Sequence, residues 1–284
     1  MLIKSYAKIN LYLKIGKKLK NNYHNIQSVM QPIQLHDNIS FEKLDENNII
    51  VESNNKDLEN KDNLAYRAAL LLKDRFRVNK GVKINIRKNI PIAAGLGGGS
   101  SNAANTLITL NKLWKLNLSQ KRLMNLASEI GSDVPFFITG KTALVEGFGN
   151  EVKPLKKSLS ANIVLINPGI KVSTAWAYKE FDKNKGKLQY KNKSNIKELI
   201  KAINKKDIRK ISENMHNDFD PIMEKKFKTV KEIKALLKKL GSLNSLVSGS
   251  GLTIFGLFDS IYTAREAYFK LKDMYPFVYL TKTI

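Results

Sequence analysis

The sequence predicts an α+β fold, because segments with the two-residue period of strands are intermixed with segments of helical period, without regular alternation. The chain has 284 residues, of which 43% are hydrophobic and 26% charged, an ordinary globular mixture. This length is typical of one large domain or two smaller ones. A turn at residues 156–158 follows a completed set of strands and helices, so we expect domains of residues 1–155 and 156–284.

The first expected strand is the clearest. Apolar residues occupy nearly all the odd positions from Ile3 to Ile15, and polar or amphipathic residues occupy the even ones. This period indicates a half-buried strand. Lys8 and Asn10 therefore share one face, which points away from the core. Residues 38–41 and 49–51 look like further short strands.

Three helices are expected next, from apolar residues that recur every three or four positions. The first covers residues 63–76, with Asp62 as its N-cap. The second follows a glycine-rich run and extends over residues 103–114. The third begins after Ser119, a typical N-cap residue, and ends at Gly131.

Alternation, short apolar runs and helical spacing predict the remaining elements. Strands are expected at residues 82–86, around Phe136, at 143–145, at 163–166, after a glycine turn at 248–251, and at 278–281. Helices are expected at residues 196–203, 208–214, 227–240 and 262–274. Residues 179–195 are rich in lysine and lack a period, which predicts an exposed connection.

Several classes of protein are excluded by composition. The sequence contains no cysteine, which excludes disulfides, thiolate nucleophiles, iron–sulfur clusters and cysteine-based zinc sites. The three histidines, His24, His36 and His216, are spread along the chain, so no histidine-rich metal site is expected. No stretch approaches the roughly 18 apolar residues of a membrane-spanning helix, and the N-terminus lacks the apolar core of a signal peptide. We therefore expect a cytoplasmic protein with no membrane partner.

The net charge of +24 raises the question of a nucleic-acid partner. Only seven of the 49 basic residues are arginine, the residue that base recognition and paired phosphate contacts favour. The lysines are spread along the chain, and asparagine is abundant as well. We therefore expect a solvated lysine-rich surface and no nucleic-acid partner, although the charge would attract small anions by long-range steering.

The strongest motif is PIAAGLGGGSS, which lies between an expected strand and an expected helix. Its four glycines let the backbone turn N–H groups toward an anion, and the helix adds its N-terminal donors. It matches neither a Walker A loop nor a dinucleotide-binding fingerprint. A flexible turn with a serine cap is the alternative, but the combination favours phosphate binding. The motif comprises Pro91, Ile92, Ala93, Ala94, Gly95, Leu96, Gly97, Gly98, Gly99, Ser100 and Ser101.

Four further features are candidates for chemistry, and each has an ordinary structural alternative. Asp133 suits the removal of a proton from a hydroxyl group, but also the start of a turn. Lys8 suits the neutralisation of a moving phosphoryl group, but is also one of many lysines. The turn at residues 248–251 is either part of a site or a hairpin loop. The pair Tyr23 and His24 is the weakest candidate, with an aromatic turn as its alternative.

Taken in order along the chain, six motifs resemble the GHMP small-molecule kinases. They are AKIN at residues 7–10, YH at 23–24, DNL at 62–64, PIAAGLGGGSSNAA at 91–104, GSDVPFF at 131–137 and SGSG at 248–251. The similarity covers nearly the whole chain. AKIN and YH point to the branch whose substrate joins cytidine diphosphate to methylerythritol. The alternatives are a GHMP kinase for homoserine, mevalonate or a sugar, a basic nucleic-acid-binding protein, and an inactive scaffold.

This resemblance implies a two-lobed kinase, with an N-terminal lobe similar to ribosomal protein S5, a ferredoxin-like C-terminal lobe and the active site between them. ATP with Mg²⁺ would be the cofactor, its phosphates held by residues 91–101 and its adenine near Asp62 and Asn63. Asp133 would accept the hydroxyl proton beside Lys8. The pocket for the substrate, whose cytosine would stack on aromatic rings, would include Asn10, Tyr23, His24, Tyr178, Ser250 and Gly251.

Three points stay open in this resemblance. Trp176 is the alternative to Tyr178 as the second stacking ring. Ala93 and Ala94 stand where the loops of the family are often richer in glycine, and they should be tolerated only while φ is negative. The oligomeric state is not defined by the sequence, and we expect a monomer or a weak homodimer.

Overall fold

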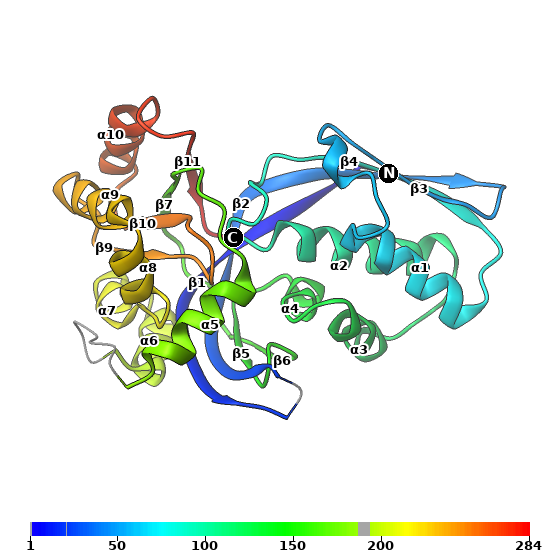
Figure 1. Cartoon of the computed structure of the whole chain (residues 1–284), viewed down its shortest axis with the longest axis horizontal. Helices are drawn as coiled ribbons and strands as arrows, with labels where there is room; N and C mark the ends of the chain where they lie inside the picture. Colours follow the sequence, from blue (N-terminus) through cyan, green and yellow to red (C-terminus); the bar gives the residue numbers. More distant parts are fainter. Residues whose placement is uncertain (1, 21, 187–193) are drawn as a thin grey trace.

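Two β-sheets with covering helices form the protein, which confirms the α+β fold. The computed structural model describes residues 2–20, 22–186 and 194–284. Figure 1 shows two halves joined by two long strands, β1 (Leu2–Lys18) and β2 (His24–Leu44). Within the described ranges, no helix is long and apolar enough to cross a membrane.

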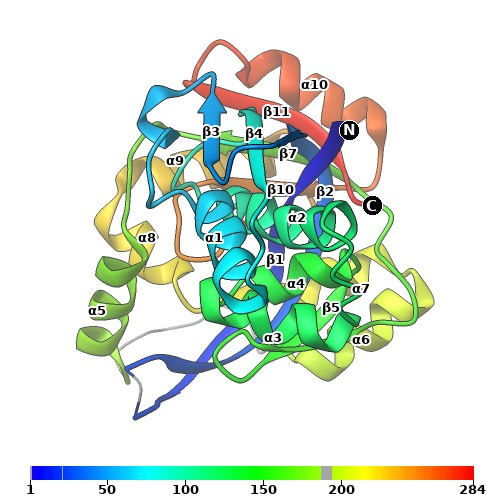
Figure 2. The same ribbon diagram turned by 90° about the vertical axis from the view of Figure 1, so that its right-hand side faces the viewer.

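The first sheet has the order β3-β4-β2-β1-β8, and β5 pairs with β2 and β6. Its other strands are β3 (Ile49–Ser53), β4 (Gly81–Arg87), β5 (Ala143–Glu146), β6 (Glu151–Pro154) and β8 (His216–Asn217). Its helices are α1 (Leu64–Phe76), α2 (Gly98–Leu113), α3 (Gln120–Ile130) and α4 (Val134–Thr139). These helices gather on one side of β3 and β4 (Figures 1 and 2), where they share one apolar core with the sheet.

The second sheet is antiparallel, with the order β11-β7-β10-β9. Its strands are β7 (Asn162–Asn167), β9 (Asn244–Val247), β10 (Ile254–Phe258) and β11 (Phe277–Lys282). The helices of this half are α5 (Thr174–Asn184), α6 (Ile196–Lys205), α7 (Ile208–Asn214), α8 (Asp220–Lys226), α9 (Lys228–Lys239) and α10 (Ile261–Leu271). One face of this sheet packs on α8, α9 and α10, and the other packs on β1, β2, α6 and α7.

The ribbon of β1 and β2 is buried on both faces near its middle. The strand expected from Ile3 to Ile15 is confirmed as β1, whereas the sequence predicts β2 only at residues 38–41. Residues 28–33 are all buried, so the alternation that reveals a half-buried strand is absent there. Lys8 and Asn10 do share a face, but the second half of the molecule covers it, and they are only 3% and 1% exposed.

Two predictions for the first half of the molecule are wrong. The apolar residues around Phe136 form α4 rather than a strand, because Pro135 favours the first turn of a helix and a short apolar run does not distinguish the two structures. Asn63, and not Asp62, is the N-cap of α1, since Asn63 Oδ1 accepts a hydrogen bond from the Ala65 amide at 2.9 Å.

Two further differences lie in the second half. Helix α5 extends through Asn184, because Ala177 and Phe181 bury one of its faces, so the expected connection over 179–195 begins as a helix. Residues 187–193 of that connection lie outside the described residues. Helix α8 is missing from the sequence predictions, because its seven residues are too few to establish a period. The other expected helices and strands are present.

The chain passes from the first sheet to the second between β6 and β7. We propose residues 1–155 and 156–284 as the two domains for this reason. The short strand β8 crosses back and pairs in parallel with β1, so the second half also contributes to the first sheet. This pairing brings the ends of both sheets together around one cavity.

Candidate active site

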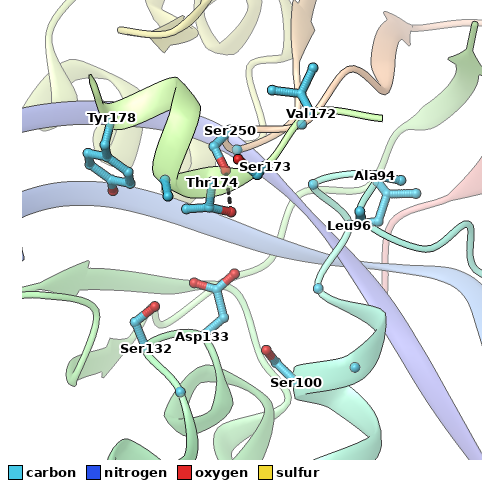
Figure 3. A pocket seen from close by; sticks show the side chains of 18 of the residues that line it. Ala94, Leu96, Ser100, Ser132, Asp133, Val172, Ser173, Thr174, Tyr178 and Ser250 are labelled. Carbon is cyan, nitrogen blue, oxygen red and sulfur yellow. Dashed lines mark hydrogen bonds between the residues drawn. The ribbon is translucent and has the colours of Figure 1, made fainter. Parts of the chain in front are cut away.

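A cavity of about 1160 Å³ lies where the two halves meet. Its walls come from β1, the N-terminus of α2, the start of α4, the start of α5 and the turn between β9 and β10. Figure 3 shows Asp133 and Ser100 on one side of this space and Thr174, Tyr178 and Ser250 on the other. The cavity therefore brings together side chains that are widely separated in the sequence.

The glycine-rich segment forms a tight turn that leads into α2. Gly95 and Gly97 adopt positive φ values of 79° and 70°, which glycine tolerates and other residues rarely adopt. In the described part of the chain, no amide from Gly95 to Ser100 donates a hydrogen bond to another protein group. These free N–H groups lie at the N-terminus of a helix, where the helix dipole also favours negative charge. The turn is thus equipped to bind an anion such as phosphate.

A second glycine turn, residues 248–251, packs directly against the first. The hydroxyl of Ser248 donates a hydrogen bond to the Gly95 carbonyl at 3.0 Å. A Cβ atom added to Gly251 would lie 2.4 Å from the Gly95 nitrogen, which only glycine avoids. Ser250 donates to Thr174 Oγ1 at 3.0 Å, so this turn also meets the start of α5 (Figure 3).

Ala93 adopts a left-handed conformation, with φ of 54°, whereas Ala94 does not. This conformation costs a residue other than glycine about 1–2 kcal/mol. We therefore expect Ala93→Gly to raise the free energy of unfolding by about 0.5–1 kcal/mol, after allowance for the freedom of glycine in the unfolded chain. Ala94→Gly should lower it by a similar amount, because Ala94 is unstrained and 3% exposed. Urea unfolding measures both shifts, and a decrease for Ala93→Gly would contradict this assignment of strain.

Lys8 and Asp133 face each other inside the cavity. Lys8 Nζ lies 3.4 Å from Asp133 Oδ2 and donates a hydrogen bond to Asn10 Oδ1 at 2.7 Å. Asn10 Nδ2 donates in turn to Ser28 Oγ at 2.9 Å, and the Lys8 amide donates to the Leu96 carbonyl at 3.0 Å. The lysine is therefore held rigidly between β1 and the glycine-rich turn.

Asp133 precedes α4, but within the described residues its carboxylate caps none of the amides of that helix. The carboxylate extends into the cavity instead (Figure 3), and its side chain is 29% exposed. A carboxylate placed in this way can accept a proton from a hydroxyl group that enters the cavity. The pair suits a reaction that removes a proton from a hydroxyl group.

An aromatic cluster forms the other end of the cavity. The His24 ring stacks on the Tyr178 ring with their centroids 5.0 Å apart, and His24 Nε2 is 2.8 Å from Asp182 Oδ1. Burial, together with the charge of Asp133, raises the pKa of the Tyr178 hydroxyl, which therefore stays neutral. Tyr23 is 54% exposed and packs on Phe148 at 5.6 Å. These rings offer flat surfaces on which a planar base can stack.

The structure brings together nearly all the site residues expected from the sequence. Each of them lines the cavity except Ser101, which is 1% exposed and accepts a hydrogen bond from Ser5 Oγ at 2.8 Å. Tyr178 lines the cavity, whereas Trp176 packs on Phe227 outside it. Asp62 and Asn63 lie beside α1, near the glycine-rich turn.

The sequence analysis missed Lys88. This residue lines the cavity and forms an ion pair with Asp37, a carboxylate with no exposed surface. A Cβ atom added to Gly98 would lie 2.9 Å from Lys88 Nζ, so this ammonium group is next to the start of α2. Nothing local distinguishes Lys88 from the other lysines, because its partner is 51 positions earlier in the chain.

Comparisons with known proteins show the family and the fold. The family models for the N-terminal and C-terminal domains of GHMP kinases match residues 63–141 and 199–276. L. major mevalonate kinase has the same fold, with a TM-score of 0.75 at 18% identity over 100% of this chain and 95% of that one. By fold and by site, this protein is a small-molecule kinase of the GHMP class.

Proteins with higher sequence identity to this chain define its family within the GHMP kinases. A 4-diphosphocytidyl-2-C-methyl-D-erythritol kinase from Clostridium perfringens (strain 13 / Type A) is 42% identical over 100% of this chain and 98% of its own length. One from Caldanaerobacter subterraneus subsp. tengcongensis is 40% identical over 99% and 96%. The crystal structure of a 4-(cytidine 5'-diphospho)-2C-methyl-D-erythritol kinase matches with a TM-score of 0.83 at 28% identity, over 100% and 99%. The chain belongs to the family of 4-diphosphocytidyl-2-C-methyl-D-erythritol kinases.

Proposed function

We propose that this kinase transfers the γ-phosphoryl group of ATP to the 2-hydroxyl of 4-diphosphocytidyl-2-C-methyl-D-erythritol. The products are the 2-phosphate and ADP, and the reaction belongs to the non-mevalonate route to isoprenoid precursors. The observation that carries the proposal is the pairing of Lys8 with Asp133 at 3.4 Å, beside the free amides of the glycine-rich turn. The identity of about 40% to the curated kinases supports the choice of substrate.

The amides from Gly95 to Ser100 are proposed to hold the phosphates of ATP. Their N–H groups are unpaired within the described protein, and Ser100 adds a hydroxyl group at the same edge of the cavity (Figure 3). Adenine would then lie toward Asp62 and Asn63, with Pro91 to Ala94 forming the adjoining wall. Lys88, which is paired with Asp37, places its ammonium group at the start of α2, where it could also donate a hydrogen bond to the anionic nucleotide.

Asp133 is proposed to accept the proton of the substrate hydroxyl as its oxygen attacks the γ-phosphorus and the bond to the bridging oxygen of ADP breaks. Lys8 neutralises charge on the transferred group. Phosphoryl transfer depends mainly on alignment and charge stabilisation. The hydrogen bonds of Lys8 to Asn10 and of its amide to Leu96 supply that alignment.

The cytidine part of the substrate is proposed to bind among the aromatic residues. Tyr23, His24 and Tyr178 surround this end of the cavity, so cytosine can stack on their rings. Asn10, Ser250 and Gly251 line the same cavity, and the methylerythritol would lie beside them. Binding one end of the substrate would thereby deliver its hydroxyl group to the phosphoryl group.

Mg²⁺ is proposed to enter with the nucleotide. Among the residues that the structure describes, no group of three or more histidine, aspartate or glutamate side chains is placed to hold a metal ion. Mg²⁺ usually binds through one or two protein ligands and the phosphates of its substrate, and Asp133 and Ser100 are oxygen donors that line the cavity. A cytoplasmic location, a monomer or weak homodimer, and the absence of a nucleic-acid partner stay predictions.

The test is ADP release, coupled to a dehydrogenase assay, with three acceptors supplied separately. We expect turnover with 4-diphosphocytidyl-2-C-methyl-D-erythritol and only background rates with homoserine and mevalonate. Phosphorus NMR of the product should place the new phosphate on the 2-hydroxyl. Turnover with homoserine or mevalonate but not with the cytidylated substrate would reject the proposed substrate while retaining a GHMP kinase.

A further inference from the structure

The segment from His216 to Asp218 is bound to the strand that carries Lys8. Tyr12 pairs with His216 and Leu13 with Asn217 in the parallel ladder of β1 and β8. The Asp218 amide donates to the Leu13 carbonyl at 2.9 Å, and Asp218 Oδ2 accepts from the Ile15 amide at 2.6 Å. The backbone of this segment is thus fixed to β1 a few residues beyond Lys8 and Asn10.

The side chain of Asn217 reaches from this segment to the second glycine turn. Its Nδ2 donates to the carbonyls of Val247 at 2.8 Å and Gly249 at 2.9 Å, and its Oδ1 accepts from the Phe219 amide at 3.0 Å. Asn217 is 2% exposed and does not line the cavity. Asp220 Oδ1 accepts from the Val247 amide at 3.0 Å. Two side chains therefore hold the end of β9, where the turn begins.

The turn held in this way is next to the proposed catalytic pair. A Cβ atom added to Gly249 would lie 3.1 Å from Lys8 Nζ and 3.3 Å from Asn10 Oδ1. Gly249 and Ser250 both line the cavity, and in the described structure neither of their amides donates to a protein group. A shift of this turn would therefore change the surroundings of Lys8 directly.

We propose that Asn217 is a positioning residue that fixes the glycine turn 248–251 at its working distance from Lys8 and Asp133. Asn217 joins the turn to β1, so the two walls of the site move as one body. The inference rests on the proposed function, because alignment matters most where a phosphoryl group moves between bound partners. The proposed role depends on the hydrogen-bond donors of the Asn217 side chain and not on its volume.

Two substitutions distinguish the effect of the Asn217 side-chain donor from the effect of its volume. Asn217→Asp keeps the size of the side chain and an acceptor for the Phe219 amide, but it places an oxygen against two carbonyl oxygens. Asn217→Leu removes donor and acceptor at similar volume. The matched control is Asn111→Leu, because the Asn111 side chain likewise donates to a backbone carbonyl and accepts from a backbone amide, both of Leu118, and neither residue lines the cavity.

The experiment measures kcat, KM for ATP, thermal unfolding and deuterium exchange of peptides covering residues 247–252. We expect both Asn217 variants to lose about 10- to 100-fold in kcat, the scale of a misaligned reactive group, with little change in KM for ATP. Exchange at residues 247–252 should rise, while Asn111→Leu loses thermal stability but keeps both kcat and exchange at this turn.

Wild-type kcat in Asn217→Asp would overturn the proposal, and so would an equal loss of kcat in Asn111→Leu. The exchange measurement needs no substrate, so it still decides the role of Asn217 if the wild-type enzyme does not phosphorylate the cytidylated acceptor. Unchanged exchange at residues 247–252 in both Asn217 variants would also reject the proposal. The experiments can therefore reject the proposed substrate and the proposed role of Asn217 independently of each other.

Discussion

Replacement of Asp133 by Asn should lower turnover by about 10²–10⁴-fold, the usual contribution of a general base. Asn has nearly the same shape but cannot accept the proton of the substrate hydroxyl. The fold should survive, because in the described structure the Asp133 carboxylate caps no helix and its side chain is 29% exposed. The ion pair with Lys8 would be lost, but Lys8 Nζ keeps its hydrogen bond to Asn10.

Steady-state kcat and thermal unfolding of Asp133→Asn check this expectation together. The matched control is Asp273→Asn, which removes an exposed carboxylate outside the cavity and should leave kcat unchanged. Near-normal turnover by Asp133→Asn would remove this carboxylate from the mechanism. A large fall in thermal stability would show instead that its role is structural.

Replacement of Lys8 by Met should reduce kcat by about 10²–10³-fold, the scale for loss of one preorganised charge or donor at the reacting group. Methionine has a similar unbranched side chain but no charge, so the transferred phosphoryl group would lose the positive charge beside it. The same change leaves Asn10 Oδ1 without its buried donor, which should cost about 1–3 kcal/mol of folding stability. Lys8→Arg should not restore activity, because a planar guanidinium does not fit a site built around a compact ammonium.

Lys4→Met provides the control for this experiment. Lys4 belongs to the same strand β1 as Lys8, but it is exposed and outside the cavity. Single-turnover rates at saturating ATP and substrate separate the chemical step from binding. Equal rates for Lys8→Met and Lys4→Met would show that the charge at residue 8 does not assist transfer.

The fold could be predicted where the order of apolar and polar residues follows the period of a strand or a helix. Strand β1 and helices α1 to α3 have clear periods, so their positions follow from the sequence. Residues 28–33 of β2 could not be predicted, since both faces of the strand are covered there and Gln31 is as buried as its apolar neighbours. Helices α4 and α8 are too short to show a period.

The site could be predicted where one continuous segment contains the chemistry. The glycines of the glycine-rich turn predict a backbone that offers its amide groups to an anion. The order of the motifs points to Lys8 and Asp133. The ion pair of Lys88 with Asp37 and the hydrogen bonds of Asn217 to the glycine turn join segments far apart in the sequence. No local pattern marks such partners, because only the folded chain brings them together.

The conformation of Ala93 illustrates the same limit. The sequence shows an alanine where glycine is common in similar loops, but only the structure shows that φ is 54° there and not at Ala94. The protein therefore tolerates one strained residue next to its proposed nucleotide site. Backbone strain of this kind is often found at functional sites.

The most direct test is a crystal structure with a non-hydrolysable ATP analogue and the cytidylated substrate. We expect the β- and γ-phosphate oxygens to accept hydrogen bonds from amides between Gly95 and Ser100. The substrate 2-hydroxyl should lie between Asp133 and the γ-phosphorus. A triphosphate bound elsewhere, with these amides still unoccupied, would contradict the account.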